Sequence, residues 1–326
     1  MKKKIAFLAP ETKWWPYFVY KDLVEWLKEK YWKELDIYFF NSKLDWIKLH
    51  FQKYDFIFSV IPFLFKPVWA KKYIFNPRWN FEIEKKKNNL WNKLLYFAKN
   101  NLKFSDKIML TSYFLADKLN FRKKNQDKIF ILPNFIDEKK YAFWEKIFDD
   151  KNFKILTITS FKFFDKWRWI LNLWNVIKKI WEKTLLKNKS KKIFWTIIWN
   201  DNSENFLKIK KDFDKIIFPK NVEIIWKWWI EKEKTLEELK DNDYFLYWTY
   251  LDNFPNIILE AIASNMKVLV NSFESFGYFL DEKIICKNES EMVEKVCSNN
   301  IFFEDVWKFW KNIISEMVYN FIKKND

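Results

Sequence analysis

The sequence predicts an α/β protein with two parallel sheets, each formed by one half of the chain. Short, continuously apolar runs alternate with longer amphipathic runs, as buried parallel strands alternate with helices. The alternation starts near residue 4 and starts again near residue 153, after a charged stretch at 138–152. A length of 326 residues, with 49% hydrophobic and 31% charged side chains, suits two folded domains.

The first half of the chain begins with the apolar run KIAFLAP at 4–10, which predicts a strand followed by a loop. Helical periodicity at 20–31 then precedes the apolar run ELDIYFF at 34–40. Together they indicate a strand–helix–strand unit. The other elements expected in this half are strands at 54–61, 106–112 and 128–137 and a helix at 88–105.

The second half repeats this pattern after the charged stretch, which we interpret as the inter-domain linker. We expect a loop at 162–169 between its first strand and first helix. The expected strands are 153–161, 192–199, 222–226, 244–248 and 267–272, and the expected helices are 170–183, 234–242, 256–265 and 304–323. The resulting domains are 1–140 and 141–305, with a C-terminal helix at 306–326.

The chain is basic, with 59 Lys and Arg against 43 Asp and Glu and a net charge of +16. Residues 1–150 hold 30 of the basic and 18 of the acidic side chains, so most of the excess lies there. Such an excess attracts nucleic acid, an anionic membrane surface or a phosphorylated substrate. A solvated basic face is the plainer alternative.

Other features narrow the class of protein. Cys286, Cys297 and His50 have no metal-ligand spacing, which argues against a structural zinc site. The sequence has no apolar run of the length that a transmembrane helix needs. The N-terminal apolar run is too short for a signal peptide. We therefore expect a cytoplasmic protein.

The clearest motif is YLDNFPNIILEAIASN at 250–265. Asp252 is followed eight residues later by Glu260, which begins the sequence Glu-Ala-Ile-Ala on a predicted helix. Asn253, Phe254 and Pro255 lie between Asp252 and this helix, which begins at Asn256. Backbone amides at the start of a helix bind anionic or hydroxyl-rich ligands. The alternative is an ordinary amphipathic helix with an acid near its N-terminus.

A second motif, ITSFKFFDKWRW at 158–169, places Lys162 and Lys166 just before a predicted helix. Two cations beside a helix N-terminus suit a nucleotide diphosphate. Two solvated loop lysines are the alternative.

Both motifs resemble those of the family 4 glycosyltransferases, which have the GT-B fold, use nucleotide sugars and retain the anomeric configuration. Residues 252–260 resemble the family's E-x7-E motif, with Asp as the first acid, and Lys166 and Trp167 match its Lys-Gly pair. Weaker matches lie at 13–17, 131–137, 196–200 and 222–228. The resemblance implies two Rossmann-like domains facing a cleft, with the last helix crossing back onto the first domain.

The resemblance also implies an activity: transfer of a sugar from a nucleotide-diphosphate-sugar to an acceptor hydroxyl, with retention and without a metal or other cofactor. Asp252 and Lys166 would be catalytic, Asp252 holding the donor sugar and Lys166 the departing diphosphate. The donor site would comprise Lys162, Lys166, Asn253, Phe254, Pro255, Asn256, Glu260, Trp14, Trp15, Trp199 and Trp226. Glu260 would hold the ribose, and Asp252, Glu260 and Lys166 would converge on the cleft.

The acceptor implied by this resemblance is a glycan or a lipid-linked precursor in cell-envelope synthesis. The basic N-terminal domain would then contact the inner face of the membrane, and no nucleic acid partner is expected. Many family members have an active-site His in this domain. His50 does not match it, and we interpret His50 as structural.

Tryptophan is abundant and glycine almost absent: the chain has 21 Trp and one Gly. In each matched motif a Trp stands where the family has Gly, namely at Trp14, Trp15, Trp167, Trp199 and Trp226. Gly serves such loops by adopting positive φ or by letting the backbone approach a phosphate. A gene that uses UGA for glycine, translated with UGA read as tryptophan, explains the pattern. The indoles of the written sequence should then crowd the site or point into solvent.

Two alternatives to this recoding hypothesis stay open. One is a core that is rich in Trp. The other is a different function, a basic, aromatic-rich protein that binds single-stranded nucleic acid without catalysis. The codon at each Trp position distinguishes them, because UGG throughout would favour the nucleic-acid binder.

Overall fold

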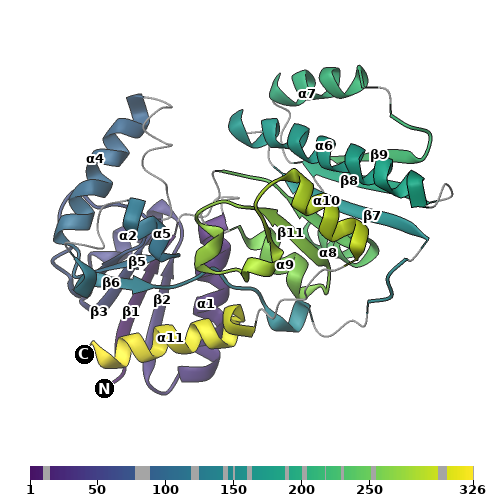
Figure 1. The fold of residues 1–326 in the computed structure, drawn as a ribbon. Coiled ribbons are helices and arrows are strands. Elements are labelled where there is room, and N and C mark those ends of the chain that lie inside the picture. The colour runs from purple at the N-terminus through teal and green to yellow at the C-terminus, as the bar shows by residue number, and fades with distance from the viewer. Residues whose placement is uncertain are drawn as a thin grey trace. The chain divides into compact units, whose positions relative to one another are not determined.

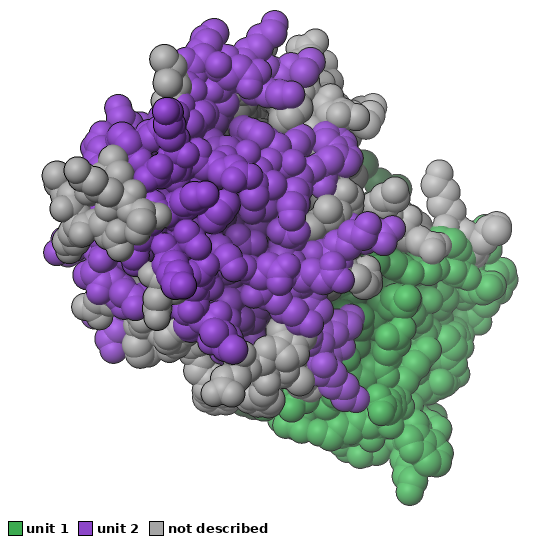
Figure 2. All heavy atoms as spheres, turned by 90° about the vertical axis from the view of Figure 1, so that its right-hand side faces the viewer, with its two compact units in different colours: residues 1–136, 307–326 green, residues 137–306 purple. Residues whose placement is uncertain are grey.

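The computed structural model describes residues 1–9, 15–77, 89–118, 125–141, 146–149, 151–159, 164–187, 191–199, 204–216, 218–228, 231–250, 255–299 and 307–325. The chain divides into two compact units, shown in Figure 2. Unit 1 is Met1–Ile136 with Trp307–Asp326, and unit 2 is Asp137–Val306. Each unit has a six-stranded sheet in which every described pair of strands is parallel. The predicted α/β class with two parallel sheets is confirmed.

The sheet of unit 1 has the strand order β2-β1-β3-β4-β5-β6 (Figure 1). Its strands are β1 (Lys3–Leu8), β2 (Leu35–Phe40), β3 (Tyr54–Ser59), β4 (Ala70–Phe75), β5 (Lys107–Leu110) and β6 (Ile129–Ile131). The helices described in this unit are α1 (Trp15–Tyr31), α2 (Lys43–Leu49), α4 (Asn89–Phe104), α5 (Tyr113–Lys118) and α11 (Lys311–Lys324).

Alternate side chains of these strands face two separate cores, because successive residues of a strand point to opposite faces. Ile5 and Phe7 of β1 pack with the buried residues of α1 and α11. Ala6 and Leu8 pack on the other face with residues of α2, α4 and α5. A sheet covered on both faces explains why its strands are continuously apolar in the sequence.

The C-terminal helix α11 packs against α1 within unit 1. The rings of Tyr31 and Tyr319 are stacked, with centroids 3.6 Å apart and planes 2° apart. The Tyr319 hydroxyl donates to Glu34 Oε2 at 2.6 Å, and Lys323 forms an ion pair with the same carboxylate. The last residues of the chain are thereby fixed to its first helix.

The sheet of unit 2 has the order β12-β11-β10-β7-β8-β9. Its strands are β7 (Asn152–Thr159), β8 (Lys192–Trp199), β9 (Val222–Trp228), β10 (Tyr244–Tyr247), β11 (Lys267–Asn271) and β12 (Ile285–Cys286). Its described helices are α6 (Phe164–Lys187), α7 (Glu204–Asp214), α8 (Lys232–Asp241), α9 (Asn256–Ala263) and α10 (Glu289–Ser298). Short 3₁₀ turns occur at Gln126–Lys128, Glu138–Lys140, Phe276–Tyr278, Glu282–Ile284 and Trp307–Phe309.

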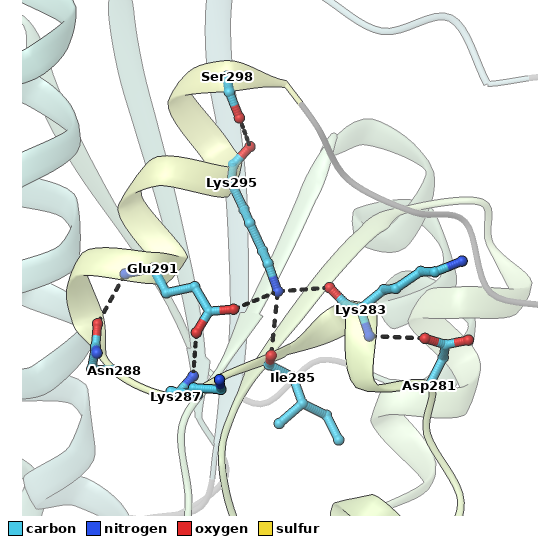
Figure 3. Close-up of polar contacts among 8 residues, drawn as sticks. All are labelled: Asp281, Lys283, Ile285, Lys287, Asn288, Glu291, Lys295 and Ser298. Atoms are coloured by element: carbon cyan, nitrogen blue, oxygen red, sulfur yellow. Dashed lines mark hydrogen bonds and ion pairs between the residues drawn. The ribbon is translucent and has the colours of Figure 1, made fainter.

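Helix α10 shows why one of these helices begins where it does (Figure 3). Asn288 Oδ1 accepts a hydrogen bond from the Glu291 backbone N–H at 3.0 Å, and Glu291 Oε2 accepts from Lys287 N at 2.8 Å. This is close to a capping box, in which side chains satisfy the free amides of the first turn. Lys295 Nζ then donates to Glu291 at 3.0 Å and to the carbonyl of Lys283 at 2.8 Å, which ties the helix to the turn before it.

Several boundaries differ from the prediction. Helix α6 starts at Phe164, so the expected loop at 162–169 is wrong from that residue onward, because the sequence there contains no helix breaker. Strand β9 continues to Trp228 instead of ending at 226. The prediction missed β4, β12 and the helices α2, α5, α7 and α10. The structure ends unit 1's first segment at Ile136, whereas the sequence placed that boundary at 140.

The segment 146–149 precedes β7 and contacts α8 and the residue just before β10 in unit 2. Lys146 Nζ donates to the Leu239 carbonyl at 2.7 Å, and Asp149 N–H donates to Asp243 Oδ2 at 3.4 Å. Burial lowers the pKa of the Lys146 ammonium to about 8, although the nearby carboxylate of Asp243 opposes this shift. The folded chain therefore holds a lysine whose charged form is disfavoured.

Lys146→Met should change how stability depends on pH. A lysine with a pKa of about 8 in the folded state and 10.5 in the unfolded state binds fewer protons when folded between those values. Its presence makes stability rise with pH across that window. As pH rises through this window, the unfolding free energy of the wild type should increase by about 1–3 kcal/mol relative to that of Lys146→Met, as measured by denaturant unfolding. Lys151→Met, at an exposed position nearby, is the control and should keep the wild-type dependence; parallel curves for Lys146→Met would contradict the assignment.

Candidate functional site

The two motifs found in the sequence start from neighbouring strands of unit 2. β10 lies between β11 and β7, and it pairs in parallel with β7 through Tyr244 and Ile155. Parallel strands end at the same edge of the sheet, which is where ligands bind in open α/β sheets. The segments leading to α6, with Lys166, and to α9, with Glu260, therefore leave the sheet side by side.

Tyr250 joins three of the segments at this carboxyl edge. Its ring makes an edge contact with Trp169 of α6, with centroids 5.4 Å apart and planes at 81°. It makes a second edge contact with Phe273, which follows β11, at 6.2 Å and 83°. Trp169 lies one turn beyond Lys166 and Tyr250 lies two residues before Asp252. These contacts thus bring the surroundings of both motifs together.

Asn271 fixes the chain just after β10. Its side chain is buried; Oδ1 accepts from Thr249 N at 2.8 Å and Nδ2 donates to Thr249 O at 2.9 Å. Both polar groups of one backbone unit are satisfied by one side chain from the neighbouring strand. A backbone held this way is oriented before any ligand arrives.

Helix α9 follows this segment and is anchored by apolar side chains. Ile258, Leu259, Ala261 and Ile262 are buried. Pro255 is the N-cap residue, with extended backbone at φ −75° and ψ 124°, and it provides no side-chain cap. Asn256 Oδ1 is buried and, among the described residues, has no hydrogen-bond partner. Among the described residues no side chain caps the first turn, whose amides therefore suit a polar ligand.

Glu260 is half-buried on α9, and Tyr141 contacts it. The Tyr141 side chain is buried, and its hydroxyl donates a hydrogen bond to the Glu260 carboxylate. Burial first, and then the charges of Glu260 and Asp137, raise the pKa of Tyr141 far above its usual range. The hydroxyl is therefore a permanent donor that orients Glu260. Sequence reasoning missed Tyr141, and the only signal was its place four residues after Asp137 of the ILPNFID segment.

The other predicted site residues are described to different extents. Lys162, Asp252, Asn253, Phe254 and Trp14 lie outside the described residues. Lys166 lies on the first turn of α6 and Trp15 is the first residue of α1, but their side chains are not among those described. Pro255, Asn256 and Glu260 lie together at the start of α9.

The two remaining predicted donor-site residues pack into unit 2. Trp199 ends β8 and is buried, and Trp226 lies within β9. Their rings meet edge to face at 5.5 Å, and Trp199 also contacts Trp228 at 5.6 Å. The expectation that the indoles crowd the site or point into solvent is therefore wrong for Trp199, because the side chain fills the space above the sheet. The indole of Trp228 does point into solvent, since it is 43% exposed.

His50 and Cys286 have structural surroundings. His50 caps the end of α2, and its ring contacts that of Trp69 at 4.2 Å. Cys286 is buried, and burial raises the pKa of its thiol to about 12. Within the described ranges, no group of three His, Cys, Asp or Glu side chains is arranged to hold a metal ion.

Solved structures show which fold this arrangement belongs to. The lipopolysaccharide outer core galactosyltransferase WaaB superposes with a TM-score of 0.62 and 12% identity, over 99% of this chain and 100% of that one. A trehalose-6-phosphate synthase gives a TM-score of 0.60 at 11% identity, over 99% of this chain and 96% of the other. The chain has the GT-B fold.

HepE of Anabaena in complex with UDP-glucose is a further neighbour, with a TM-score of 0.55 and 10% identity over 99% of this chain and 95% of that one. Neither the models of known protein families nor the curated protein sequences give a match. At these identities the likeness concerns the fold alone. Within the described part of the chain, no helix has the length and apolar character needed to cross a membrane.

A double-mutant cycle tests the contact between Tyr141 and Glu260 without any assumption about function. Tyr141→Phe, Glu260→Gln and the double variant should show a coupling in unfolding free energy of about 1–3 kcal/mol, as for a hydrogen bond to a charged group. Glu294→Gln, at an exposed position on α10, is the matched control and should not couple to Tyr141→Phe. Purely additive effects of the first pair would remove Tyr141 from the site.

Proposed function

We propose that the protein is a retaining glycosyltransferase that moves a sugar from a nucleotide-diphosphate-sugar to an acceptor hydroxyl. The observation that carries the proposal is the parallel pairing of β10 with β7, from which the segments with Lys166 and Glu260 leave the sheet at one carboxyl edge. Such an edge in a GT-B domain is a natural site for a nucleotide. HepE, a neighbour in fold, is described in complex with UDP-glucose.

Each charged residue of the proposed site has a distinct task. Lys166 and Lys162 would neutralise the charge that develops on the diphosphate as the bond to the sugar breaks. The uncapped amides at the start of α9 would add to this stabilisation. Glu260, oriented by Tyr141, would accept hydrogen bonds from the ribose hydroxyls. Asp252 would hold the donor sugar.

Retention and the absence of a required metal belong to the proposal as well. The lysines and helix amides supply positive charge that a divalent cation supplies in other glycosyl transfers. One structural neighbour is a trehalose-6-phosphate synthase, whose description concerns glycosyl transfer with retention. The anomeric configuration of the product, read by NMR, tests this part.

The acceptor side would be unit 1, in the cytoplasm at the inner face of the membrane. Unit 1 holds 31 basic and 15 acidic side chains, whereas unit 2 holds 28 of each. The whole net charge of +16 therefore lies on unit 1. A basic unit suits an anionic glycan or lipid-linked precursor of the cell envelope. One neighbour in fold, WaaB, is a lipopolysaccharide outer core galactosyltransferase.

The alternative of a nucleic-acid binder has less support. Stacking on bases requires exposed aromatic rings beside cations. Among the tryptophans whose side chains the structure describes, two are exposed, Trp32 and Trp228. Each unit therefore has one exposed indole among those described.

We also propose that the native protein has Gly at most of the 21 Trp positions. The indole nitrogens of Trp69, Trp181 and Trp248 are buried and have no hydrogen-bond partner among the described residues. Buried Trp N–H groups are normally bonded, and each unmet one costs about 1–3 kcal/mol. Trp32 directly follows α1, where a helix often ends in Gly, and is 58% exposed. Trp195 is the opposite case, since it is fully buried and donates to Thr157 Oγ1 at 3.0 Å.

Glu260→Gln and Lys166→Ala should each impair sugar transfer while the fold stays intact. The donor would first be identified by a thermal-shift screen of nucleotide sugars, using protein with Gly at the proposed positions. Loss of one charged contact should then lower kcat/KM by tens to hundreds of fold, or about 2–4 kcal/mol. Glu294→Gln and Lys178→Ala, at exposed positions on α10 and α6, are the matched controls. Near-wild-type turnover of both site variants would refute the proposed site.

Peptide mass spectrometry of the protein from its native host tests the recoding. The tryptic peptides 14–21 and 228–232 each contain two adjacent Trp in the written sequence. Each should be lighter by two indole side chains, while the peptide with Trp195 should keep its indole. Peptides 14–21 and 228–232 at their full written mass would end the recoding hypothesis and favour a Trp-rich core.

A further inference from the structure

Four strongly exposed apolar side chains of unit 1 lie in two segments that are close in the sequence. Phe51 is 81% exposed, Leu64 63%, Phe65 67% and Val68 86%. They lie at the end of α2 and in the connection between β3 and β4. Scattered single exposed apolar residues are ordinary, but several in neighbouring segments mark an interaction surface.

The connection that carries them is held firmly. Asn101 of α4, fully buried, accepts from Phe63 N at 2.9 Å through Oδ1 and donates to Phe63 O at 2.6 Å through Nδ2. Lys66 Nζ pairs with Asp106 at 2.6 Å. Because both ends of the 63–66 segment are fixed, the exposure of Leu64 and Phe65 is a property of the fold.

Backbone contacts bring the two segments together. Tyr54 N–H donates to Trp69 O at 2.8 Å, so the residues after α2 run beside those that precede β4. This bond uses main-chain atoms and holds for Trp or Gly at position 69. Phe51 and Val68 therefore lie along the same edge, at the amino ends of β3 and β4. This edge is opposite the carboxyl edge, which a substrate of unit 1 would use.

Lysines accompany these apolar side chains. Lys48, Lys53 and Lys71 are exposed, and Lys66 is partly so. Lys48 and Lys71 pair with Asp45 at 3.0 Å and Asp55 at 2.6 Å. Exposed ion pairs contribute little to stability, so these lysines can exchange a carboxylate for a phosphate oxygen.

We propose that this surface, made of the end of α2 and the β3–β4 connection, docks on an anionic lipid bilayer. Aliphatic and aromatic side chains beside lysines fit the boundary between headgroups and acyl chains, where apolar groups insert and cations meet lipid phosphates. Two of the four apolar side chains, Leu64 and Val68, have no ring on which a base could stack. Two copies meeting through it would bring together two units that each carry the full +16. The proposal rests on the proposed function only in that unit 1 would work at a membrane; the surface lies away from the edge that an acceptor would use, and its binding is measured without donor or acceptor.

The test is sedimentation of the full chain with vesicles, in the absence of any sugar nucleotide. Vesicles of equal parts phosphatidylglycerol and phosphatidylcholine should bind the wild type, and vesicles of phosphatidylcholine alone should bind it at least tenfold more weakly. The triple variant Leu64→Ser, Phe65→Ser, Val68→Ser should lose tenfold or more of the binding to anionic vesicles. Because all three side chains are exposed, its thermal midpoint should match that of the wild type.

Matched variants decide between explanations. Ile147→Ser with Leu207→Ser removes two exposed apolar side chains of unit 2 and should leave vesicle binding unchanged. Lys53→Gln with Lys71→Gln should weaken binding to anionic vesicles and reduce its dependence on salt. Equal binding by the triple variant and the wild type would overturn the proposal. So would a dimer, or a complex with single-stranded nucleic acid, that the triple substitution abolishes while vesicle binding is absent. A wild type that binds vesicles but turns over no donor would refute the proposed function and leave this surface standing.

Discussion

The parallel pairing of β10 with β7 is the constraint on which the candidate site depends. Because both strands run the same way, the chain leaves them at one edge, and α6 and α9 begin near each other although they are far apart in sequence. The pairing alone would leave these segments loosely placed. The ring of Tyr250 against Trp169 and Phe273, and the double hydrogen bond of Asn271 to Thr249, fix the residues that lead toward Asp252. The paired strands thus set the position of the site, and the ring contacts and hydrogen bonds at their carboxyl edge fix its segments.

The elements that the sequence predicted well are those whose burial on both sides leaves a continuous apolar run. β1, β2, β7 and β8 are of this kind. β4 was missed because its first residues are Ala-Lys-Lys, which sit at the exposed end of the sheet and hide the buried Tyr-Ile-Phe that follows. Helix α6 was placed too late because the prediction expected a Gly-like break at Trp167, and the written sequence has none.

Contacts between distant segments were beyond the sequence for a different reason. The E-x7-E resemblance identified Glu260 from local spacing, but nothing local to Tyr141 or Glu260 shows that the two side chains meet. Tyr141 lies near the start of unit 2 in the sequence, whereas Glu260 lies more than a hundred residues later, in α9. Only the fold makes them neighbours. The same holds for Asn101, whose two bonds to Phe63 turn an apolar loop into a fixed surface.

The separation of charge between the units completes this account. Unit 2 is neutral overall, so in the proposed function specific cations and helix amides would supply the attraction for a nucleotide diphosphate at its carboxyl edge. Unit 1 has the reverse design, with a broad basic excess and apolar side chains held out on a fixed loop. A broad excess suits an extended anionic surface better than a single small ligand, because its attraction acts over about a Debye length and needs no fixed geometry. Under the proposals made above, unit 2 would bind a small anion through fixed geometry, and unit 1 would bind a large one through its charge and its exposed apolar side chains.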